Sequence, residues 1–249
     1  MFDLSGKKAL VTGGCSGIGL AIVKRFMAAG ASVMAADLRS TAEFNSTGAA
    51  FVEIDVADEE RVAAAFAEAE AQLGKLDILV NNAGIALDTG PITDTDLALF
   101  EKTQDVNLKG IFLGMKYGPR HMNDGGSIIN TASTAASLVF PEYTTYSISK
   151  AGVVCLTTNA AVELAPRRIR VNAVCPGTTT TPMEPADSEE SRLCSLTTCA
   201  GRPGTPEEQA AVFHFLAADD SSYVNAQAIR VDGGGVFGLT YEASEKLLS

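Results

Sequence analysis

The chain has 249 residues, 46% of them hydrophobic, which is enough for one large α/β domain with a sizeable core. Its formal net charge of −11 and its 6% aromatic content argue against binding to nucleic acid or to anionic membrane surfaces. No apolar run approaches the length of a membrane span, and the N-terminus lacks an apolar signal core. We therefore expect a cytoplasmic protein that acts on a small molecule.

Short apolar runs alternate with longer helical segments along the chain. Strands are predicted at 8–11, 32–36, 50–54, 78–80, 127–131, 170–174 and 228–231. Helices are predicted at 18–29, 58–73, 95–106, 108–121, 146–164 and 207–217. This alternation predicts a single domain over residues 1–249, a doubly wound parallel sheet of the Rossmann type with helices on both faces. Ligands of such sheets bind beyond the carboxyl ends of the strands.

One long stretch, 178–204, has no clear periodicity and is rich in Thr, Ser, Pro and charged residues. We predict a mobile loop over the substrate site. Within it, residues 184–192 carry one arginine, Arg192, against the acidic residues Glu184, Asp187, Glu189 and Glu190. We hypothesise that these carboxylates repel polyanionic substrates such as acyl carriers. The alternative is a solvated loop face that never meets substrate.

A glycine-rich turn follows the first strand and opens the first helix. Gly13, Gly17 and Gly19 would let the backbone approach a pyrophosphate closely, and the start of the helix around Ser16 and Ile18 would supply amide donors. A dinucleotide site is therefore predicted here, with an ordinary tight turn as the alternative.

Acidic residues close the second and third strands. Asp37 follows Gly19 by eighteen residues, where a carboxylate can accept both ribose hydroxyls of NAD and would repel the extra phosphate of NADP. No Lys or Arg occupies positions 14–16 to bind that phosphate. Asp55 and Val56 could hydrogen-bond and flank an adenine, and Asp55 could also cap the following helix. The predicted cofactor is NAD.

Tyr146, Lys150 and Ser133 form a candidate acid/base group. Residues four apart share one face of a helix, so the Lys150 ammonium would lie beside the Tyr146 phenol. Such a charge about 4 Å away could lower the phenol pKa by up to roughly 3 units, towards neutrality. Ser133 could hold a substrate oxygen against that phenol. Taken alone, the spacing also fits a surface Tyr/Lys pair.

In this order and spacing, the motifs resemble those of the short-chain dehydrogenase/reductase family over nearly the whole chain. The matching motifs are Thr12-Gly13-x-x-x-Gly17-Ile18-Gly19, Asn81-Asn82-Ala83-Gly84, Val106-Asn107-Leu108, Ser133, Tyr146-x-x-x-Lys150, and Pro176-Gly177 with Thr181. The resemblance implies that Tyr146 is the proton donor and acceptor, with Ser133 on the substrate oxygen. It implies that Lys150 binds the nicotinamide ribose and that Asn107 holds a water of a proton relay.

The resemblance also implies further cofactor contacts and an assembly. The implied cofactor contacts are Asn82, Ala83, Gly84, Tyr146, Lys150, Pro176, Gly177, Thr179 and Thr181. It further implies a homotetramer or homodimer, with the helix that carries Tyr146 packed against a neighbour.

The predicted function is hydride transfer between NAD(H) and a small, neutral or cyclic, secondary alcohol or ketone. The side chains of Leu138, Val139, Phe140 and Met183 suggest a partly apolar substrate pocket. Two alternatives are an NADPH-linked 3-oxoacyl reductase, against which Asp37 argues, and a non-catalytic dinucleotide sensor, against which the complete tetrad argues. The cysteines and histidines show no metal-ligand spacing, so no metal is predicted, and the five thiols are expected to be mostly buried and reduced, with exposure as the alternative for Cys194 and Cys199.

Overall fold

A seven-stranded parallel sheet organises the molecule. The computed structural model describes residues 2–87, 90–138 and 141–235. The strand order is β3-β2-β1-β4-β5-β6-β7, and every neighbouring pair is parallel. The strands are β1 (Lys8–Thr12), β2 (Ser32–Asp37), β3 (Ala50–Glu53), β4 (Leu76–Asn81), β5 (Met122–Thr131), β6 (Arg170–Pro176) and β7 (Ala228–Val231). The predicted doubly wound fold is confirmed, with all seven strands at the expected places.

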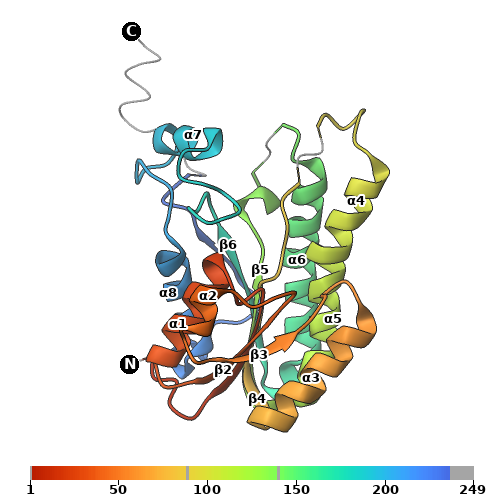
Figure 1. The fold of residues 1–249 in the computed structure, drawn as a ribbon, viewed down its shortest axis with the longest axis vertical. Helices are drawn as coiled ribbons and strands as arrows, with labels where there is room; N and C mark the ends of the chain where they lie inside the picture. The colour runs from red at the N-terminus through yellow and green to blue at the C-terminus, as the bar shows by residue number, and fades with distance from the viewer. Residues whose placement is uncertain (1, 88–89, 139–140, 236–249) are drawn as a thin grey trace.

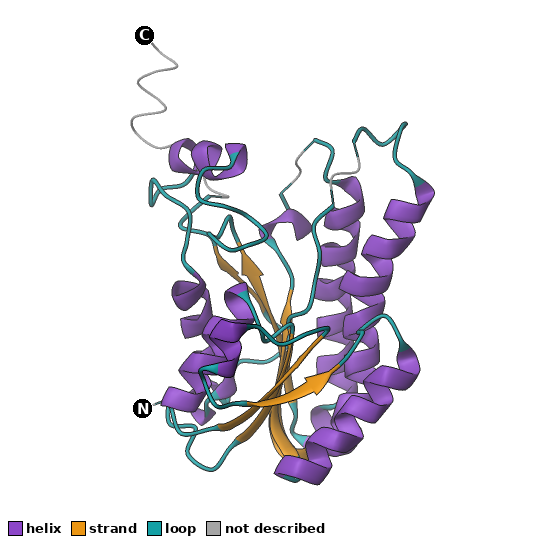
Figure 2. Ribbon diagram, viewed as in Figure 1, coloured by secondary structure: helices purple, strands orange, loops and turns teal. Residues whose placement is uncertain are grey.

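Helices cover both faces of this sheet (Figures 1 and 2). They are α1 (Gly17–Ala28), α2 (Ala42–Asn45), α3 (Glu59–Leu73), α4 (Leu97–Gln104), α5 (Gly110–Tyr117), α6 (Thr144–Glu163), α7 (Glu189–Thr197) and α8 (Pro206–Ala217). One buried apolar cluster packs α3, α5 and α6 against the sheet, and the other packs α1 and α8 against the opposite face. None of the helices in the described ranges is both long and apolar enough to cross a membrane.

Local chemistry explains where several helices start and stop. The Asp58 carboxylate accepts hydrogen bonds from the backbone of Glu60 and Arg61, so it caps α3, and Gly74 ends that helix at a φ of 81°. At α8, Thr205 and Glu208 form a reciprocal capping box. These caps lie where the sequence predicts the two helices to begin.

The predicted helices 95–106 and 108–121 form one continuous rod instead of two separate helices. A π-helical turn, Asp105–Lys109, joins α4 to α5, and a short 3₁₀ turn, Gly118–His121, replaces the predicted last turn. Such π-turns are often found at functional sites because the extra residue redirects a side chain.

The prediction of an irregular loop over 178–204 is wrong in one part. Helix α7 lies inside it, and Figure 1 shows this helix at the end of the molecule where β6 finishes. The Ser188 hydroxyl accepts a hydrogen bond from the backbone of Ser191, and Glu189 and Glu190 occupy the first turn, where carboxylates favour a helix. These start signals were overlooked because the segment's mean composition is that of a loop.

Candidate functional site

A cavity of about 850 Å³ opens at the carboxyl ends of the strands. It is lined by all but two of the predicted site residues. The predicted residues in its wall are Gly13, Ser16, Gly17, Ile18, Asp37, Asp55, Val56, Asn82, Ala83, Gly84, Ser133, Tyr146, Lys150, Pro176, Gly177, Thr179 and Thr181. Only Gly19 and Asn107 lie outside the wall, and each supports a residue that lines it.

Backbone geometry explains the glycines of the first turn. Gly13 and Gly17 have φ angles of +64° and +50°, which L side chains rarely adopt. A Cβ on Gly13 would lie 2.9 Å from the Cα of Ala83, and a Cβ on Gly19 would overlap the carbonyl oxygen of Gly13. Gly13 and Gly17 therefore shape an open cradle, while Gly19 lets α1 pack tightly on the turn below it.

The Asp37 carboxylate is held at the rim of the cradle. Its Oδ2 accepts from the Cys15 backbone N–H at 3.1 Å, and its Oδ1 accepts from the Leu38 backbone N–H at 2.8 Å. Asp55 lies beside the cavity, where its Oδ1 accepts from the Ala57 backbone N–H at 2.9 Å. The alternative role of Asp55 as a helix cap falls to Asp58 instead.

Asn82 joins the ends of neighbouring strands. Its Nδ2 lies within 3.3 Å of the carbonyl oxygens of Thr12 and Gly13, and its Oδ1 accepts from the Thr131 hydroxyl at 3.2 Å. The side chain thus ties β1 to the ends of β4 and β5 beneath the cavity floor.

Three of the proposed catalytic side chains meet in this cavity. Ser133 and Tyr146 both line it, and the Ser133 hydroxyl accepts a hydrogen bond from the Ala135 N–H at 3.1 Å. The Lys150 Nζ lies 5.5 Å from the centroid of the Tyr146 ring and donates to the Thr131 carbonyl oxygen at 2.9 Å. Residues from the end of β5 and the first turns of α6 are brought together because the strand points at the start of that helix.

The electrostatics of this group differ from the prediction. Burial raises the pKa of Tyr146 to about 12, although the nearby Ser133 hydroxyl acts in the opposite direction. Burial also lowers the pKa of Lys150 to about 8. The expectation that Lys150 brings the phenol pKa near neutrality is therefore wrong for the protein without its cofactor. The Lys150 ammonium is directed at the Thr131 carbonyl oxygen. Burial removes both this ammonium and the Tyr146 phenol from water.

Asn107 lies in the π-turn, fully buried behind the cavity wall. Its Oδ1 accepts from the Ile85 N–H at 2.8 Å, and its Nδ2 donates to the Ile85 carbonyl oxygen at 2.8 Å and to the Ser149 hydroxyl at 3.3 Å. A Cβ on Gly84 would lie 3.2 Å from the Asn107 Oδ1 and 3.4 Å from the Lys150 Nζ. Asn107 and Lys150 therefore approach each other across Gly84, and the predicted water between them stays a prediction.

The substrate side of the cavity contains three residues that the sequence analysis did not assign to it, Pro141, Pro182 and Leu193. Tyr143 lines it too, as does Met183 among the apolar residues predicted for this pocket, whereas Leu138 does not, and 139–140 lie outside the described residues. Of the acidic residues hypothesised to meet the substrate, Glu184, Glu189 and Glu190 line the cavity and Asp187 does not. Leu193 could be placed only with α7.

The remaining titratable groups do not form a second catalytic centre in the part of the chain that the structure describes. There, no group of three or more His, Cys, Asp and Glu side chains could hold a metal ion. His121 pairs with Glu70 at 2.6 Å. Cys194 is buried, as expected for most of the thiols, whereas Cys199 is exposed, which was the alternative for both residues.

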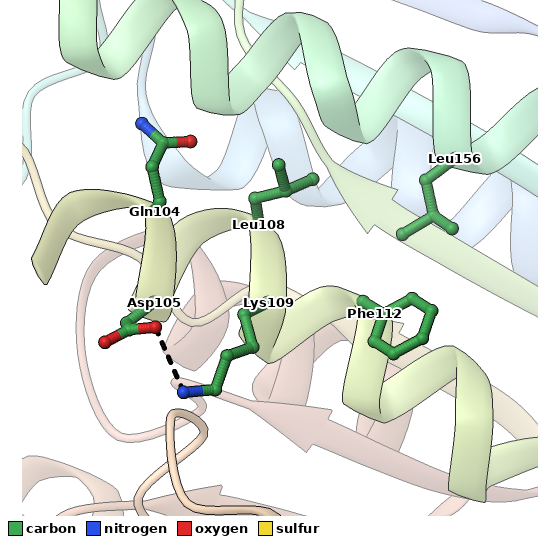
Figure 3. Close-up of a pocket in the computed structure, with 6 residues that line it drawn as sticks. All are labelled: Gln104, Asp105, Leu108, Lys109, Phe112 and Leu156. Carbon is green, nitrogen blue, oxygen red and sulfur yellow. Dashed lines mark hydrogen bonds and ion pairs between the residues drawn. The ribbon is translucent and has the colours of Figure 1, made fainter. Parts of the chain in front are cut away.

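A second cavity, of about 390 Å³, lies away from this chemistry on the outer side of the α4–α5 rod (Figure 3). Its wall contains Gln104, Asp105, Leu108, Lys109, Phe112 and Leu156. Lys109 is paired with Asp105 at 3.0 Å, and the apolar side chains of Leu108, Phe112 and Leu156 surround the rest of the hollow. The three apolar side chains leave an apolar groove on the surface beside this ion pair.

Curated relatives match almost the whole chain. A 3beta-hydroxysteroid dehydrogenase 2 of Eggerthella lenta is 37% identical over 247 residues, covering 93% of this chain and 95% of the relative. A borneol dehydrogenase of Lavandula x intermedia is 42% identical, covering 93% and 91%. A cis-4-hydroxycyclohexanecarboxylate dehydrogenase of Sinomonas cyclohexanicum is 39% identical, covering 91% and 95%.

Solved structures agree with this match. A short-chain dehydrogenase/reductase of Serratia marcescens superposes with a TM-score of 0.88 at 36% identity, covering 93% of this chain and 98% of that one. A short-chain dehydrogenase of Burkholderia cenocepacia, solved in complex with NADP, superposes with a TM-score of 0.88 at 34% identity, covering 94% and 99%. The family model described as enoyl-(acyl carrier protein) reductase matches residues 13–235. With these matches and the geometry of the cavity together, the chain belongs to the short-chain dehydrogenase/reductase family.

Proposed function

We propose that this oxidoreductase transfers hydride between NAD(H) and a small, neutral or cyclic, secondary alcohol or its ketone. The observation that carries the proposal is that Ser133, Tyr146 and Lys150 line one cavity, with the Lys150 Nζ 5.5 Å from the Tyr146 ring centroid. Relatives whose names specify borneol, a hydroxysteroid and a hydroxycyclohexanecarboxylate support a ring-bearing substrate.

The cavity fits a dinucleotide at its cofactor end. The glycine cradle leaves room for backbone contact with a pyrophosphate, and the start of α1 directs amide groups towards it. The fixed Asp37 carboxylate supports NAD, because it would accept ribose hydroxyls and repel a 2′-phosphate. A family member solved in complex with NADP leaves the NADPH-linked 3-oxoacyl reductase as the alternative. Kinetics with NAD and with NADP separate the two functions.

In the proposed reaction, NAD held in this cavity would supply the acceptor for the hydride of the carbinol carbon. Tyr146 takes the hydroxyl proton, and Ser133 donates a hydrogen bond to the oxygen on which charge develops. Lys150 supplies a positive charge 5.5 Å from the Tyr146 ring, which favours the phenolate once it forms. Asn107 keeps the Ile85 backbone in place and would anchor a water that passes the proton outwards.

We also propose that the chain assembles as a homotetramer or homodimer through the outer face of α5 and α6. The groove of Figure 3 supports this assembly, because Phe112 is 50% exposed at an otherwise apolar surface. The predicted cytoplasmic location stays a prediction.

Replacing Tyr146 with Phe tests the proposed chemistry. The variant keeps the ring and its packing but loses the group that exchanges the proton, so kcat should fall by at least about a thousandfold. NADH binding, followed by fluorescence titration, should change by less than about threefold, because the ring stays. The assay follows reduction of NAD with a panel of cyclic secondary alcohols.

A matched control and a cofactor comparison complete that experiment. Tyr223, which is fully exposed, should tolerate the same Tyr-to-Phe change without loss of kcat. The wild type should show higher kcat/KM with NAD than with NADP. Near-normal turnover by Tyr146→Phe would contradict the proposed mechanism. A higher kcat/KM with NADP would favour the 3-oxoacyl reductase alternative.

A further inference from the structure

The carboxylate of Glu190 bridges three segments around the substrate side of the cavity. Its Oε2 accepts from the Tyr143 hydroxyl at 2.8 Å, and its Oε1 accepts from the Thr178 hydroxyl at 3.2 Å. Tyr143 directly precedes α6, Thr178 follows β6, and Glu190 itself stands in the first turn of α7. Both carboxylate oxygens are thus fixed, and all three residues line the cavity.

This carboxylate is also close enough to act on the reacting group. The Tyr143 ring stands edge-on to the Tyr146 ring, with 6.2 Å between centroids and an interplanar angle of 90°. The charge of Glu190 contributes to the raised pKa values of Tyr146, Tyr143 and Glu184. A group that shifts all three is positioned to repel any anion placed between them.

The charges of the cavity wall are unevenly distributed. Glu184, Glu189 and Glu190 line it from the segment that follows β6. Among the described residues in the wall, the cations are Lys102 and Lys150, and neither belongs to that segment. Lys150 is buried and donates to a backbone carbonyl, so it does not neutralise the carboxylates of α7.

We propose that Glu190 determines the charge of the substrate: its carboxylate, held by Tyr143 and Thr178, excludes alcohols that bear a carboxylate, sulfonate or phosphate and admits uncharged ones. The inference rests on the proposed function and narrows its substrate class. By this inference, the substrate of this chain differs in charge from the compound for which one relative is named, a hydroxycyclohexanecarboxylate.

Glu190→Gln removes the charge while retaining the shape and an acceptor oxygen for Tyr143. The probes are cis-4-hydroxycyclohexanecarboxylate and its methyl ester, which differ mainly in charge. The kcat/KM ratio of acid to ester should rise about tenfold in the variant, as expected when about 1.4 kcal/mol of repulsion is removed. The matched control is Asp187→Asn, because Asp187 is exposed on the same segment and does not line the cavity. It should leave the ratio unchanged.

Two further readouts separate a charge effect from a structural one. Since the carboxylate raises the pKa of Tyr146, its removal should move the acid limb of the kcat/KM profile for the ester to lower pH. Binding of cyclohexanecarboxylate and of cyclohexanecarboxamide to the NADH complex can be compared without turnover. The acid should gain about tenfold in affinity relative to the amide in Glu190→Gln.

The possible failures are distinguishable. If neither alcohol is oxidised, the proposed function fails, and the binding comparison still decides on Glu190. If the acid-to-ester ratio and the acid-to-amide affinity ratio both stay within about twofold of the wild type, the role of Glu190 is refuted while the dehydrogenase proposal stands. A ratio that rises equally in Asp187→Asn would also overturn the inference, because it would assign the effect to net charge.

Discussion

At the residue scale, Lys150 shows a conflict between stability and function. The side chain is buried at 3% exposure, and its ammonium donates a hydrogen bond to the Thr131 carbonyl oxygen. Burial opposes the charged form and lowers its pKa from 10.5 to about 8. A buried cation of this kind weakens the folded state, whereas the proposed mechanism requires its charge.

The pH dependence of stability should reveal this conflict in Lys150→Met. Between pH 8 and 10.5 the unfolded wild-type chain binds more protons at this position than the folded one does, so wild-type stability should rise with pH relative to the variant. The relative gain across that window should be at most about 3 kcal/mol, from a lowering of about 2.5 pKa units.

Urea unfolding at several pH values measures that gain, with Lys102→Met as the control at an exposed lysine of α4. A difference between wild type and Lys150→Met that stays constant from pH 7 to 10.5 would show that the ammonium is not desolvated. Catalysis should be lost in the variant regardless of stability, since the charge near Tyr146 is gone.

At the element scale, α7 and α8 have equivalent N-caps but different surroundings. Ser188 caps α7 and Thr205 caps α8, each through its hydroxyl. Helix α8 buries Ala210, Phe213 and Leu216 in the core against α1 and the sheet. In contrast, α7 has no residue in either core cluster among the described residues.

The same hydroxyl deletion should therefore give two different results. Thr205→Ala should lower the global free energy of unfolding by about 1 kcal/mol, because α8 unfolds with the core. Ser188→Ala should leave the global value within about 0.5 kcal/mol of wild type, yet speed amide exchange in α7 and raise KM. Urea titration and hydrogen exchange separate the two, and equal global losses would show that α7 belongs to the core.

At the scale of the whole molecule, the outer face of the α4–α5 rod and α6 is the surface that assembly would use. Leu108, Phe112 and Leu156 form an apolar groove there that the monomer does not fill (Figure 3). Burying such side chains between copies stabilises an oligomer through removal of apolar area from water.

Phe112→Glu should convert the assembly into smaller species. A carboxylate in this groove would have to be desolvated on association, which costs several kcal/mol. Light scattering after size-exclusion chromatography measures the mass, with Tyr223→Glu as a control at an exposed aromatic residue outside the groove. A wild type that is monomeric at micromolar concentration would contradict the proposed assembly.

The order of strands and helices could be predicted because it depends on local patterns. Apolar runs define the buried strands, and glycines such as Gly13 mark turns that only their backbone freedom permits. The positions of Asp37 and Asn82 at the carboxyl edge of the sheet then follow from the parallel topology alone. The loop-like composition of 178–204 hides the local start signals of α7, which are the Ser188 cap and the acidic first turn.

Tertiary structure decided what those residues experience. The pKa of Tyr146 is governed by burial, which depends on every segment packed around the cavity and cannot be read from the nearby Lys150. The bridge from Glu190 to Tyr143 spans 47 residues of sequence, so no local pattern contains it. The sequence by itself determined the fold and the chemistry available at one edge of the sheet, because periodicity and backbone freedom are local. Desolvation and contacts between distant residues set the pKa values and the charges around these side chains, because both arise only when the chain is folded.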